Sequence, residues 1–297
     1  MNKDYKLYIK ACEAFIRRTA KLQEPFILKG SYLSRQFFQN PEYRIPNDLD
    51  WIYHHGILKN EVLDREDAKI IFRNWVNKVI TLDLQDDIIF EFKNQVDFWE
   101  ISSYEYYLDF RTLGTALKCS IKGKVLNSFP LEISFNKQLD AAPEPILYKP
   151  FQGKPFVVPH VAPLSLQISW KIHQCLIDFR FKDIFDLIHL LKSPILNENI
   201  LWKILQALVN ECFRSKTPLD NFKYFLRADL RSLSQVDIDR FWNYWRFDNY
   251  SDCAGKITDI NLLPTKLFLF ERQLEESLEI AGLKGLSLKD LPEPTSK

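Results

Sequence analysis

Two aspartates separated by one residue, Asp48 and Asp50, are the first candidates for chemistry in this chain. They lie in the segment DLDWIY, whose apolar residues predict a β-strand that begins at Asp48. Because side chains alternate across a strand, both carboxylates would project from one face, about 6.6 Å apart along the chain. Repulsion at that separation costs about 2.5 kcal/mol at an effective dielectric constant of about 20. The pair therefore indicates a site for a divalent cation such as Mg²⁺, with a solvated acidic strand end as the simpler interpretation.

Lys29, Gly30 and Ser31 form a second candidate site. Apolar residues 25–28 predict a buried strand and residues 32–38 predict a helix, which places Gly30 and Ser31 at a strand-to-helix turn. Free backbone N–H groups at such a turn attract phosphate, and glycine allows a nucleotide to approach the backbone. Taken alone, Gly-Ser before a helix is commonly a cap. A strand, a Gly-Ser turn, a helix and a strand with D-x-D, in that order, indicate a nucleotide site more specifically.

A third carboxylate is expected near the aspartate pair, and Glu132 meets the requirement. In the segment FPLEISF (129–135), Leu131, Ile133 and Phe135 would face the core, which leaves Glu132 on the opposite face of the strand. A carboxylate in that position could hold a catalytic metal and accept a proton from an attacking hydroxyl. An exposed strand glutamate without a catalytic role is the alternative.

These motifs together resemble a known fold. KGS followed by DLD, with a later strand carboxylate, is similar to the DNA polymerase β type of nucleotidyltransferase. Residues 165–191 (SLQISWKIHQCLIDFRFKDIFDLIHLL) resemble more narrowly the AbiEii/AbiGii toxin family, in which a lysine on one helix precedes R-x-K-D-x-x-D-L at the start of the next. The matching positions are Lys171, Arg180, Lys182, Asp183, Asp186 and Leu187. The combined resemblance covers residues 25–191.

The resemblance implies a role for each candidate residue. The residues that would bind the nucleotide phosphates are Lys29, Gly30, Ser31 and Lys171. The residues that would bind Mg²⁺ or Mn²⁺ and form the catalytic carboxylate set are Asp48, Asp50 and Glu132. Lys171 would neutralise the charge of the triphosphate, and Asp183 would help to place Lys171 or the acceptor.

The activity implied by the resemblance is a Mg²⁺-dependent transfer of NMP from an NTP to a hydroxyl acceptor. The acceptor would be RNA or tRNA, and the protein would be the toxin of a toxin–antitoxin or phage-defence system with a cognate antitoxin as partner. Two alternatives stay open. The acceptor could be a small molecule or a protein, or the chain could be a catalytically silent nucleotide-binding module.

Two features depart from the family pattern. Sixteen residues (32–47) separate Ser31 from Asp48, so we expect an insertion such as QNPEYRIPN to loop out. Trp170 stands where the family often has an acidic residue before the lysine.

On the following helix, Asp183, Asp186 and His189 share one face, which we expect to turn toward the cleft. An ion pair between Asp186 and Arg180 is the alternative for Asp186.

The remaining pattern predicts an α+β domain with a mixed sheet, of the polymerase β-like type, followed by a helical domain. Helices are expected over residues 4–23 and 60–81, with Asn60 as a cap, and strands over 88–92, 113–121 and 125–135. The proline-rich segment 140–163 is expected to be a connector. Further helices are expected near 168–179, 184–191, 197–213, 234–247 and 264–281, followed by a polar tail from residue 286 that should fray. We place the domains at 1–150 and 151–297, the second contributing Lys171 and Asp183 to the cleft.

Composition narrows the class of protein. The 297 residues are 46% hydrophobic and 27% charged, with 40 basic and 39 acidic side chains, so neither disorder nor a strongly basic nucleic-acid platform is indicated. The sequence lacks the run of roughly 20 apolar residues that a membrane-spanning helix needs, and we expect a cytoplasmic protein without a membrane partner. The five cysteines are scattered and form no C-x-x-C pair, which favours reduced thiols.

Overall fold

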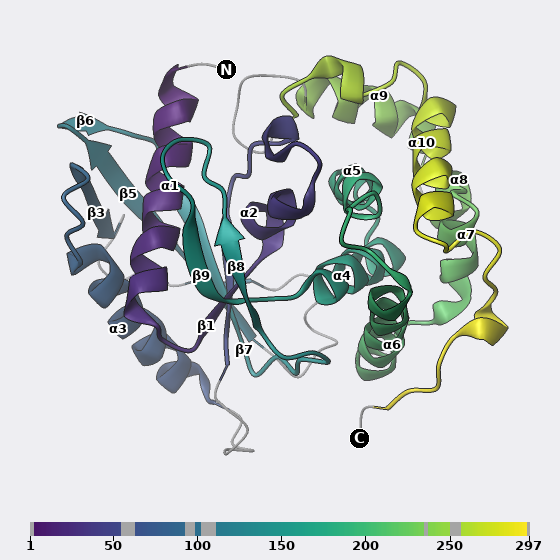
Figure 1. The fold of residues 1–297 in the computed structure, drawn as a ribbon, viewed down its shortest axis with the longest axis horizontal. Helices are drawn as coiled ribbons and strands as arrows, with labels where there is room; N and C mark the ends of the chain where they lie inside the picture. The colour runs from purple at the N-terminus through teal and green to yellow at the C-terminus, as the bar shows by residue number, and fades with distance from the viewer. Residues whose placement is uncertain are drawn as a thin grey trace.

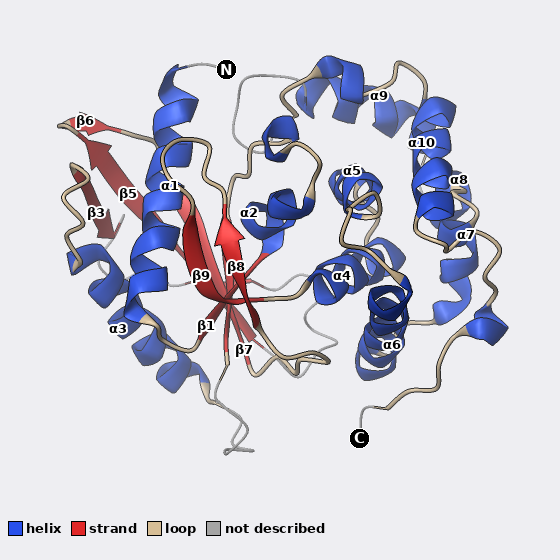
Figure 2. Cartoon of the chain, in the orientation of Figure 1, coloured by secondary structure: helices blue, strands red, loops and turns tan. Residues whose placement is uncertain are grey.

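The computed structural model describes residues 3–54, 63–92, 99–101, 111–234, 237–249 and 257–295. Figure 1 shows a β-sheet in the amino-terminal half, with α1 (Lys3–Leu22) and α3 (Arg65–Thr81) on one side and the carboxy-terminal helices on the other. In Figure 2 the strands gather in one half of the molecule, and the described residues after Val161 form helices and loops. The fold is therefore a sheet layer that continues into a helical half, as the sequence predicts.

The described residues form a sheet of nine strands in the order β3-β5-β7-β2-β1-β9-β8, with β4 and β6 also paired to β5. The strands are β1 (Phe26–Lys29), β2 (Leu49–Tyr53), β3 (Ile88–Phe92), β4 (Trp99–Ile101), β5 (Arg111–Ile121), β6 (Lys124–Val125), β7 (Phe129–Phe135), β8 (Glu144–Tyr148) and β9 (Phe156–Val161). The β2–β7 and β1–β9 pairs are parallel, whereas β1 and β2 are antiparallel. The sheet is thus mixed, and β1 and β2 lie side by side near its middle.

Helices flank the sheet and form the carboxy-terminal half. The remaining α-helices are α2 (Gly30–Ser34), α4 (Leu164–Ile177), α5 (Phe181–Leu190), α6 (Glu198–Ser215), α7 (Phe222–Leu226), α8 (Leu230–Leu233), α9 (Ile238–Asn249) and α10 (Leu267–Ile280). Short 3₁₀ segments are η1 (Arg35–Phe37), η2 (Pro41–Tyr43), η4 (Leu219–Asn221), η5 (Ile260–Leu262) and η6 (Leu288–Asp290). Two of these helices, α4 and α5, lie near the sheet; α4 begins directly after the last strand, and α5 follows α4.

Two aromatic clusters hold these layers together. Phe15 on α1 makes edge-to-face contacts with Trp75 of α3 and with Phe129 of β7, at ring-centroid distances of 5.7 and 6.1 Å. Phe181, the first residue of α5, contacts Trp242 of α9 in a similar way at 5.1 Å. Such pairs add about 0.5–1.5 kcal/mol each to the burial of their surface. The sheet is therefore packed against α1 and α3, and the start of α5 is packed against α9.

The predicted first helix, the strand–turn–helix around Gly30 and the strand after Asp48 are confirmed. The predicted helix 60–81 begins at Arg65, with Asp64 as its cap, because the Asp64 carboxylate accepts from the backbone N–H of Asp67 at 2.9 Å. Asn60, which was expected to cap this helix, lies outside the described residues. The single strand expected at 125–135 is wrong, since β6 ends at Val125 and β7 begins at Phe129.

The proline-rich segment 140–163 is not only a connector, because it contributes β8 and β9 to the sheet. Pro145 lies in β8, the edge strand, and the β8–β9 register shifts between Glu144 and Ile146, opposite the part of β9 that contains Pro159. Proline lacks an N–H donor and is tolerated at edges and bulges. The division into domains at residue 150 stays a prediction, and the sheet itself runs on to Val161.

The described part of the polar tail, up to residue 295, does not fray as expected. Ser287 caps η6 together with Asp290, and Nε2 of Gln206 on α6 donates to the carbonyl of Glu293 at 2.9 Å. The backbone N–H of Thr295 also donates to Oδ1 of Asn210 at 2.9 Å. The tail is thus held against α6 by hydrogen bonds. Four cysteines are free and buried, as expected for reduced thiols, and Cys253 lies outside the described residues.

Candidate active site

Gly30 and Asp50 form the centre of the site. Gly30 follows β1 with φ +74°, a left-handed conformation that favours glycine, and Lys29 pairs with Asp50 across the antiparallel β1–β2 register. A Cβ on Gly30 would lie 2.7 Å from Cγ of Asp50 and closer still to Oδ2. Only a glycine therefore allows the Asp50 carboxylate to lie against the turn. The adjacent lysine contributes a charge, with its Nζ 4.0 Å from Oδ1 of Asp50.

All eight residues proposed from the sequence line one cavity of ≈ 370 Å³. They are Lys29, Gly30, Ser31, Asp48, Asp50, Glu132, Lys171 and Asp183. The wall also contains residues for which the sequence suggested no role, namely Thr112, Gln167, Gln174 and Lys182. The cavity is large enough for a small-molecule ligand, since such sites span roughly 300–1,000 Å³. Its wall combines β1, β2 and β7 with α4 and α5, which are far apart in the sequence.

The three carboxylates lie along neighbouring strands. Asp50 on β2 is in register with Glu132 on β7, and Asp48 precedes β2 by one residue. Burial raises the pKa of Asp50, and the negative charge of Asp48 raises it further, against the opposing effect of Lys29. Within the described part of the chain, no group of three or more His, Cys, Asp or Glu side chains is gathered into a ready-made metal site. The aspartate pair nevertheless suits a divalent cation, because a cation beside Asp50 would relieve this repulsion.

The residue before Asp48 is tied to α1. The hydroxyl of Tyr8 donates a hydrogen bond to the backbone carbonyl of Asn47. Burial raises the pKa of Tyr8 well above its ordinary value, so the phenol keeps its proton and remains the donor. The start of β2 is thereby fixed from the opposite side of the sheet.

On the helical side of the cavity, Lys171 is held by two aspartates. Its Nζ lies 3.1 Å from Oδ1 of Asp183 and 2.7 Å from Oδ2 of Asp186. Arg180 holds the other oxygen of Asp183, with Nε at 2.7 Å, and Arg44 makes an ion pair with Asp186. Two carboxylates thus share three cations, and this arrangement fixes the ammonium of Lys171 at the cavity wall.

Charge pairing outweighs desolvation in this cluster. Burial raises the pKa of Asp183, but Lys171, Arg180 and Lys182 lower it more, and the result is a pKa of about 2. In the same way, burial lowers the pKa of Lys171, but Asp186 and Asp183 raise it more. The lysine is therefore a cation at neutral pH. Burial, followed by the charges of Arg180 and Arg44, lowers the pKa of Lys182, which lines the cavity beside this cluster.

The structure corrects two expectations about the helix α5. The ion pair considered between Asp186 and Arg180 is wrong, because Asp186 pairs with Arg44 and Lys171. The face of α5 does not turn toward the cleft as a whole, since Asp183 lines the cavity whereas His189 packs between the rings of Phe38 and Tyr43. Burial lowers the pKa of His189 to about 4, so it is neutral at pH 7.

The insertion expected to loop out is instead packed into the fold. Arg44 and Ile45 are buried, and Arg44 forms an isolated bridge with Ile257 in the carboxy-terminal half. The backbone N–H of Thr258 donates to the carbonyl of Tyr43 at 3.0 Å. Sequence reasoning missed Arg44 as part of the site. Asp186 was the one available signal for Arg44, because a buried carboxylate needs a cationic partner and therefore predicts one.

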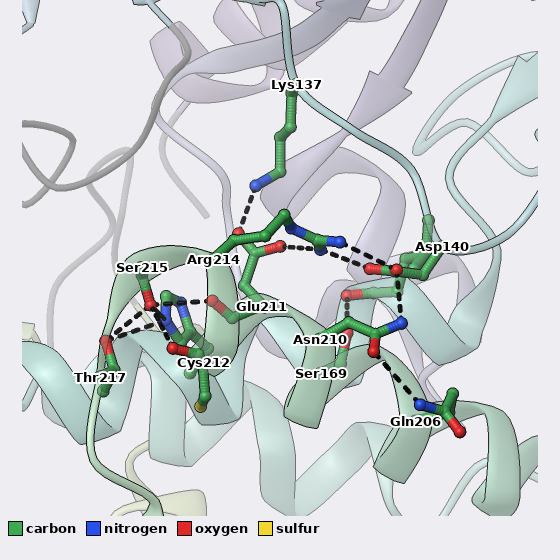
Figure 3. Close-up of polar contacts among 12 residues, drawn as sticks. Lys137, Asp140, Ser169, Gln206, Asn210, Glu211, Cys212, Arg214, Ser215 and Thr217 are labelled. Carbon is green, nitrogen blue, oxygen red and sulfur yellow. Dashed lines mark hydrogen bonds and ion pairs between the residues drawn. The ribbon is translucent and has the colours of Figure 1, made fainter. Parts of the chain in front are cut away.

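Trp170 and Lys137 connect the cavity wall to a second polar cluster. Trp170 lines the cavity, and Nζ of Lys137 lies 5.0 Å from the centre of its ring. Lys137 also forms a buried ion pair with Glu211 of α6 at 2.6 Å, which Figure 3 shows together with Arg214 and Asp140. Arg214 contacts Asp140 at 2.5 Å and Glu211 at 2.7 Å. The aromatic wall is therefore backed by a cation that α6 holds in place.

No helix among the described residues is long and apolar enough to cross a membrane. This finding agrees with the absence of a long apolar run in the sequence.

A protein-family model described as "Nucleotidyl transferase AbiEii toxin, Type IV TA system" matches residues 14–253. Among solved structures, MenT4, a nucleotidyltransferase toxin from Mycobacterium tuberculosis H37Rv, is similar over 96% of this chain and 86% of that chain, with a TM-score of 0.52 and 11% sequence identity. At this identity the similarity concerns the fold. No curated protein matches the chain in sequence.

Proposed function

Because this chain belongs to the AbiEii family of nucleotidyltransferase toxins, we propose that it transfers NMP from an NTP to a hydroxyl of RNA. The 3′ end of a tRNA is the acceptor that we favour. The family belongs to type IV toxin–antitoxin systems, which implies an NTP substrate and a cognate antitoxin. A cytoplasmic location, where NTP and RNA are abundant, and a role in phage defence are parts of the same proposal.

One observation carries this proposal: acidic and basic residues face the same ≈ 370 Å³ cavity from opposite elements. The carboxylates of Asp50 and Glu132 come from the sheet, whereas Lys171 comes from α4. Nucleotidyl transfer needs both, because the attacking hydroxyl must lose a proton while the departing pyrophosphate gains negative charge. A site for a neutral metabolite would not require this separation of charges.

The residues present suit a divalent cation, Mg²⁺ or Mn²⁺. Asp48 and Asp50 would hold it, with Glu132 as the third carboxylate, and the upward shift of the Asp50 pKa supports this assignment. Gly30 supports it as well, because its missing side chain leaves room for Asp50 at the phosphate turn. When bound, such an ion would polarise the transferred phosphate and neutralise part of its charge.

Each protein group then has a defined task. Glu132 accepts the proton of the acceptor hydroxyl, whose oxygen bonds to the α-phosphorus of the NTP. The bond from that phosphorus to the bridging oxygen breaks, and pyrophosphate leaves with the electron pair. Lys171 donates to the triphosphate oxygens, and Asp183 positions Lys171 through their contact at 3.1 Å. The backbone at Gly30 and Ser31, together with Lys29, holds the remaining phosphates.

The proposed division of the chain at residue 150 gives the two halves separate tasks. The first half, residues 1–150, would supply the carboxylates and the phosphate turn. The second half, residues 151–297, would supply Lys171 and Asp183 to the same cleft. Binding of the triphosphate would then hold the two halves together.

The test is transfer of label from α-³²P-NTP to total RNA by purified protein with Mg²⁺, using each of the four NTPs separately. We expect labelled RNA with wild-type protein and none with Asp48→Asn or Asp50→Asn. Asp220→Asn, which changes an exposed aspartate outside the cavity, is the matched control and should retain activity. Label that persists in both site variants would reject the carboxylate assignment.

The same assay separates the alternative functions. Label that enters small molecules or protein from an RNA-free extract, but not RNA, would indicate a different acceptor. A protein that binds NTP with equal affinity with and without Mg²⁺, and transfers nothing, would be a catalytically silent module.

A further inference from the structure

Gln167 on α4 carries a buried amide at the cavity wall. Its side chain is 2% exposed, and it lines the cavity together with Trp170, Lys171 and Gln174. These residues follow Gln167 by three, four and seven positions, so they share the helix face that α4 turns toward the cavity. Gln167 is thus a buried residue that also lines the cavity.

Only one end of this amide is satisfied. Oε1 accepts a hydrogen bond from Oγ of Ser34 at 3.1 Å, and Ser34 is completely buried. Among the described residues, Nε2 of Gln167 has no hydrogen-bond partner. Because the Ser34 hydroxyl holds the oxygen end, the nitrogen is the end that remains to donate. Buried donors without a partner are uncommon in folded proteins and call for an explanation, which a ligand supplies.

The surroundings of Nε2 favour an anionic oxygen as its partner. Ser34 ends α2, which begins at Gly30, so Gln167 contacts the element that carries the proposed phosphate turn. Lys29 and Lys171 line the same cavity and would attract a polyanion. Phosphate oxygens accept hydrogen bonds and donate none, which matches an amide nitrogen that can only donate. A neutral donor also adds a contact without adding another charge to the cluster.

We propose that Nε2 of Gln167 donates a hydrogen bond to a phosphate oxygen of the bound NTP, and that Ser34 orients the amide for this contact. The proposal rests on the NTP-dependent activity proposed above and adds a residue to its phosphate site. Because the contact is to phosphate, its contribution is the same for all four bases.

The experiment measures binding of α,β-methylene NTP analogues, which cannot transfer NMP, to the full chain by calorimetry. Gln167→Met keeps the length of the side chain and removes its polar end. We expect about tenfold weaker binding of all four analogues, since hydrogen bonds to charged groups contribute that much or more. Ser34→Ala leaves the donor but not its orientation, and a smaller loss of about threefold is expected.

Controls separate binding from folding. Gln167→Met leaves the Ser34 hydroxyl without its acceptor, so the double variant Ser34→Ala/Gln167→Met removes both and should show the same tenfold loss as Gln167→Met. Gln206→Met changes a half-buried glutamine of α6 outside the cavity and should bind like the wild type. Thermal unfolding of each variant without nucleotide checks that the fold is intact.

The outcomes are distinct. A wild-type protein that binds no analogue overturns the proposed function and this contact with it. A wild-type protein that binds, together with a folded double variant that binds equally well, overturns the contact alone. A loss restricted to one base, or an equal loss for the nucleoside without phosphates, overturns the assignment to a phosphate oxygen.

Discussion

The carboxylate of Asp50 occupies the space that a side chain on Gly30 would need. With φ +74° at Gly30 and a separation of 2.7 Å between a notional Cβ and Cγ of Asp50, the turn after β1 and the start of β2 form one structural unit. A change at the glycine therefore reaches the carboxylate directly. The proposed phosphate turn and the proposed metal ligand cannot be altered independently.

Gly30→Ala is expected to reduce stability and activity together. The left-handed backbone alone costs an alanine about 1 kcal/mol. Contact with Asp50 adds about 1–3 kcal/mol, because Asp50 or the turn must move. Gly123→Ala is the matched control, since Gly123 has φ +79° but nothing within 4 Å of its notional Cβ. Urea unfolding measures the free energy of unfolding of both variants. Equal losses of this free energy would show that the Asp50 side chain moves away at little cost.

Asp186→Asn is expected to destabilise the protein by about 3 kcal/mol, because it leaves Arg44 and Lys171 buried with one carboxylate fewer. The exposed pair Arg231–Asp239, at 2.8 Å, gives the comparison. Asp239→Asn should change the free energy of unfolding by less than about 1 kcal/mol. Denaturant unfolding at pH 7 provides both values. A loss at Asp186 as small as that at Asp239 would mean that water reaches the Lys171 cluster.

Much of the site could be predicted because it depends on local patterns. Alternation along β2 and β7 placed Asp50 and Glu132 on defined faces, and a parallel register then brought them side by side. The resemblance in residues 165–191 predicted Lys171 and Asp183 as site residues, and both line the cavity. The family match confirms the resemblance and the nucleotidyltransferase class. These features arise from short segments, in which the side-chain period or a local motif is sufficient to predict which residues face the site.

The parts that could not be predicted depend on contacts between distant segments. Arg44 lies 142 positions from Asp186, in a segment without helical or strand period, and only the folded chain brings them together. The amide of Gln167 depends in the same way on Ser34, 133 positions away. Strands β8 and β9 were missed because their prolines suggested a connector, and their pairing with a bulge compensates for the missing N–H donors. The tail was expected to fray because its contacts with α6 are invisible in its polar composition.

Acid is expected to destabilise the protein in two stages. Burial lowers the pKa of His173 and His189 to about 4, so the unfolded chain binds their protons first, and stability falls as the pH drops from 6.5 to about 4. Burial would raise the pKa of Asp183 and Glu211, but neighbouring cations lower both to about 2. The contribution of each carboxylate, about 2–3 kcal/mol, is complete above the unfolded-state pKa and is lost as the pH falls toward 2.

Urea unfolding at pH 7.5, 5 and 3 tests this profile. His189→Phe, which keeps a ring between Phe38 and Tyr43, should roughly halve the upper stage, because His173 remains, and should leave the lower stage unchanged. Constant stability between pH 7.5 and 5 in the wild type would contradict the assignment of neutral buried histidines.

The contribution of Asp50 to stability should depend on pH in the opposite sense from that of the paired carboxylates Asp183 and Glu211. Burial and the charge of Asp48 raise its pKa, so the native state gains from a proton on Asp50, and this gain is lost as the pH rises through the raised value. The ionised form of Asp50 is therefore unfavourable in the native state, and Asp50→Asn should raise the melting temperature at pH 7 without added metal. Mg²⁺ or Mn²⁺ should stabilise the wild type by binding to the native state, and EDTA should remove the effect. Asp50→Asn should lose this response, whereas Asp220→Asn, outside the cavity, should keep it. An equal metal-dependent rise in the melting temperature of Asp50→Asn would place the ion elsewhere. A lower melting temperature of that variant without metal would show that Lys29, whose Nζ lies 4.0 Å from Asp50, already compensates the charge of the carboxylate.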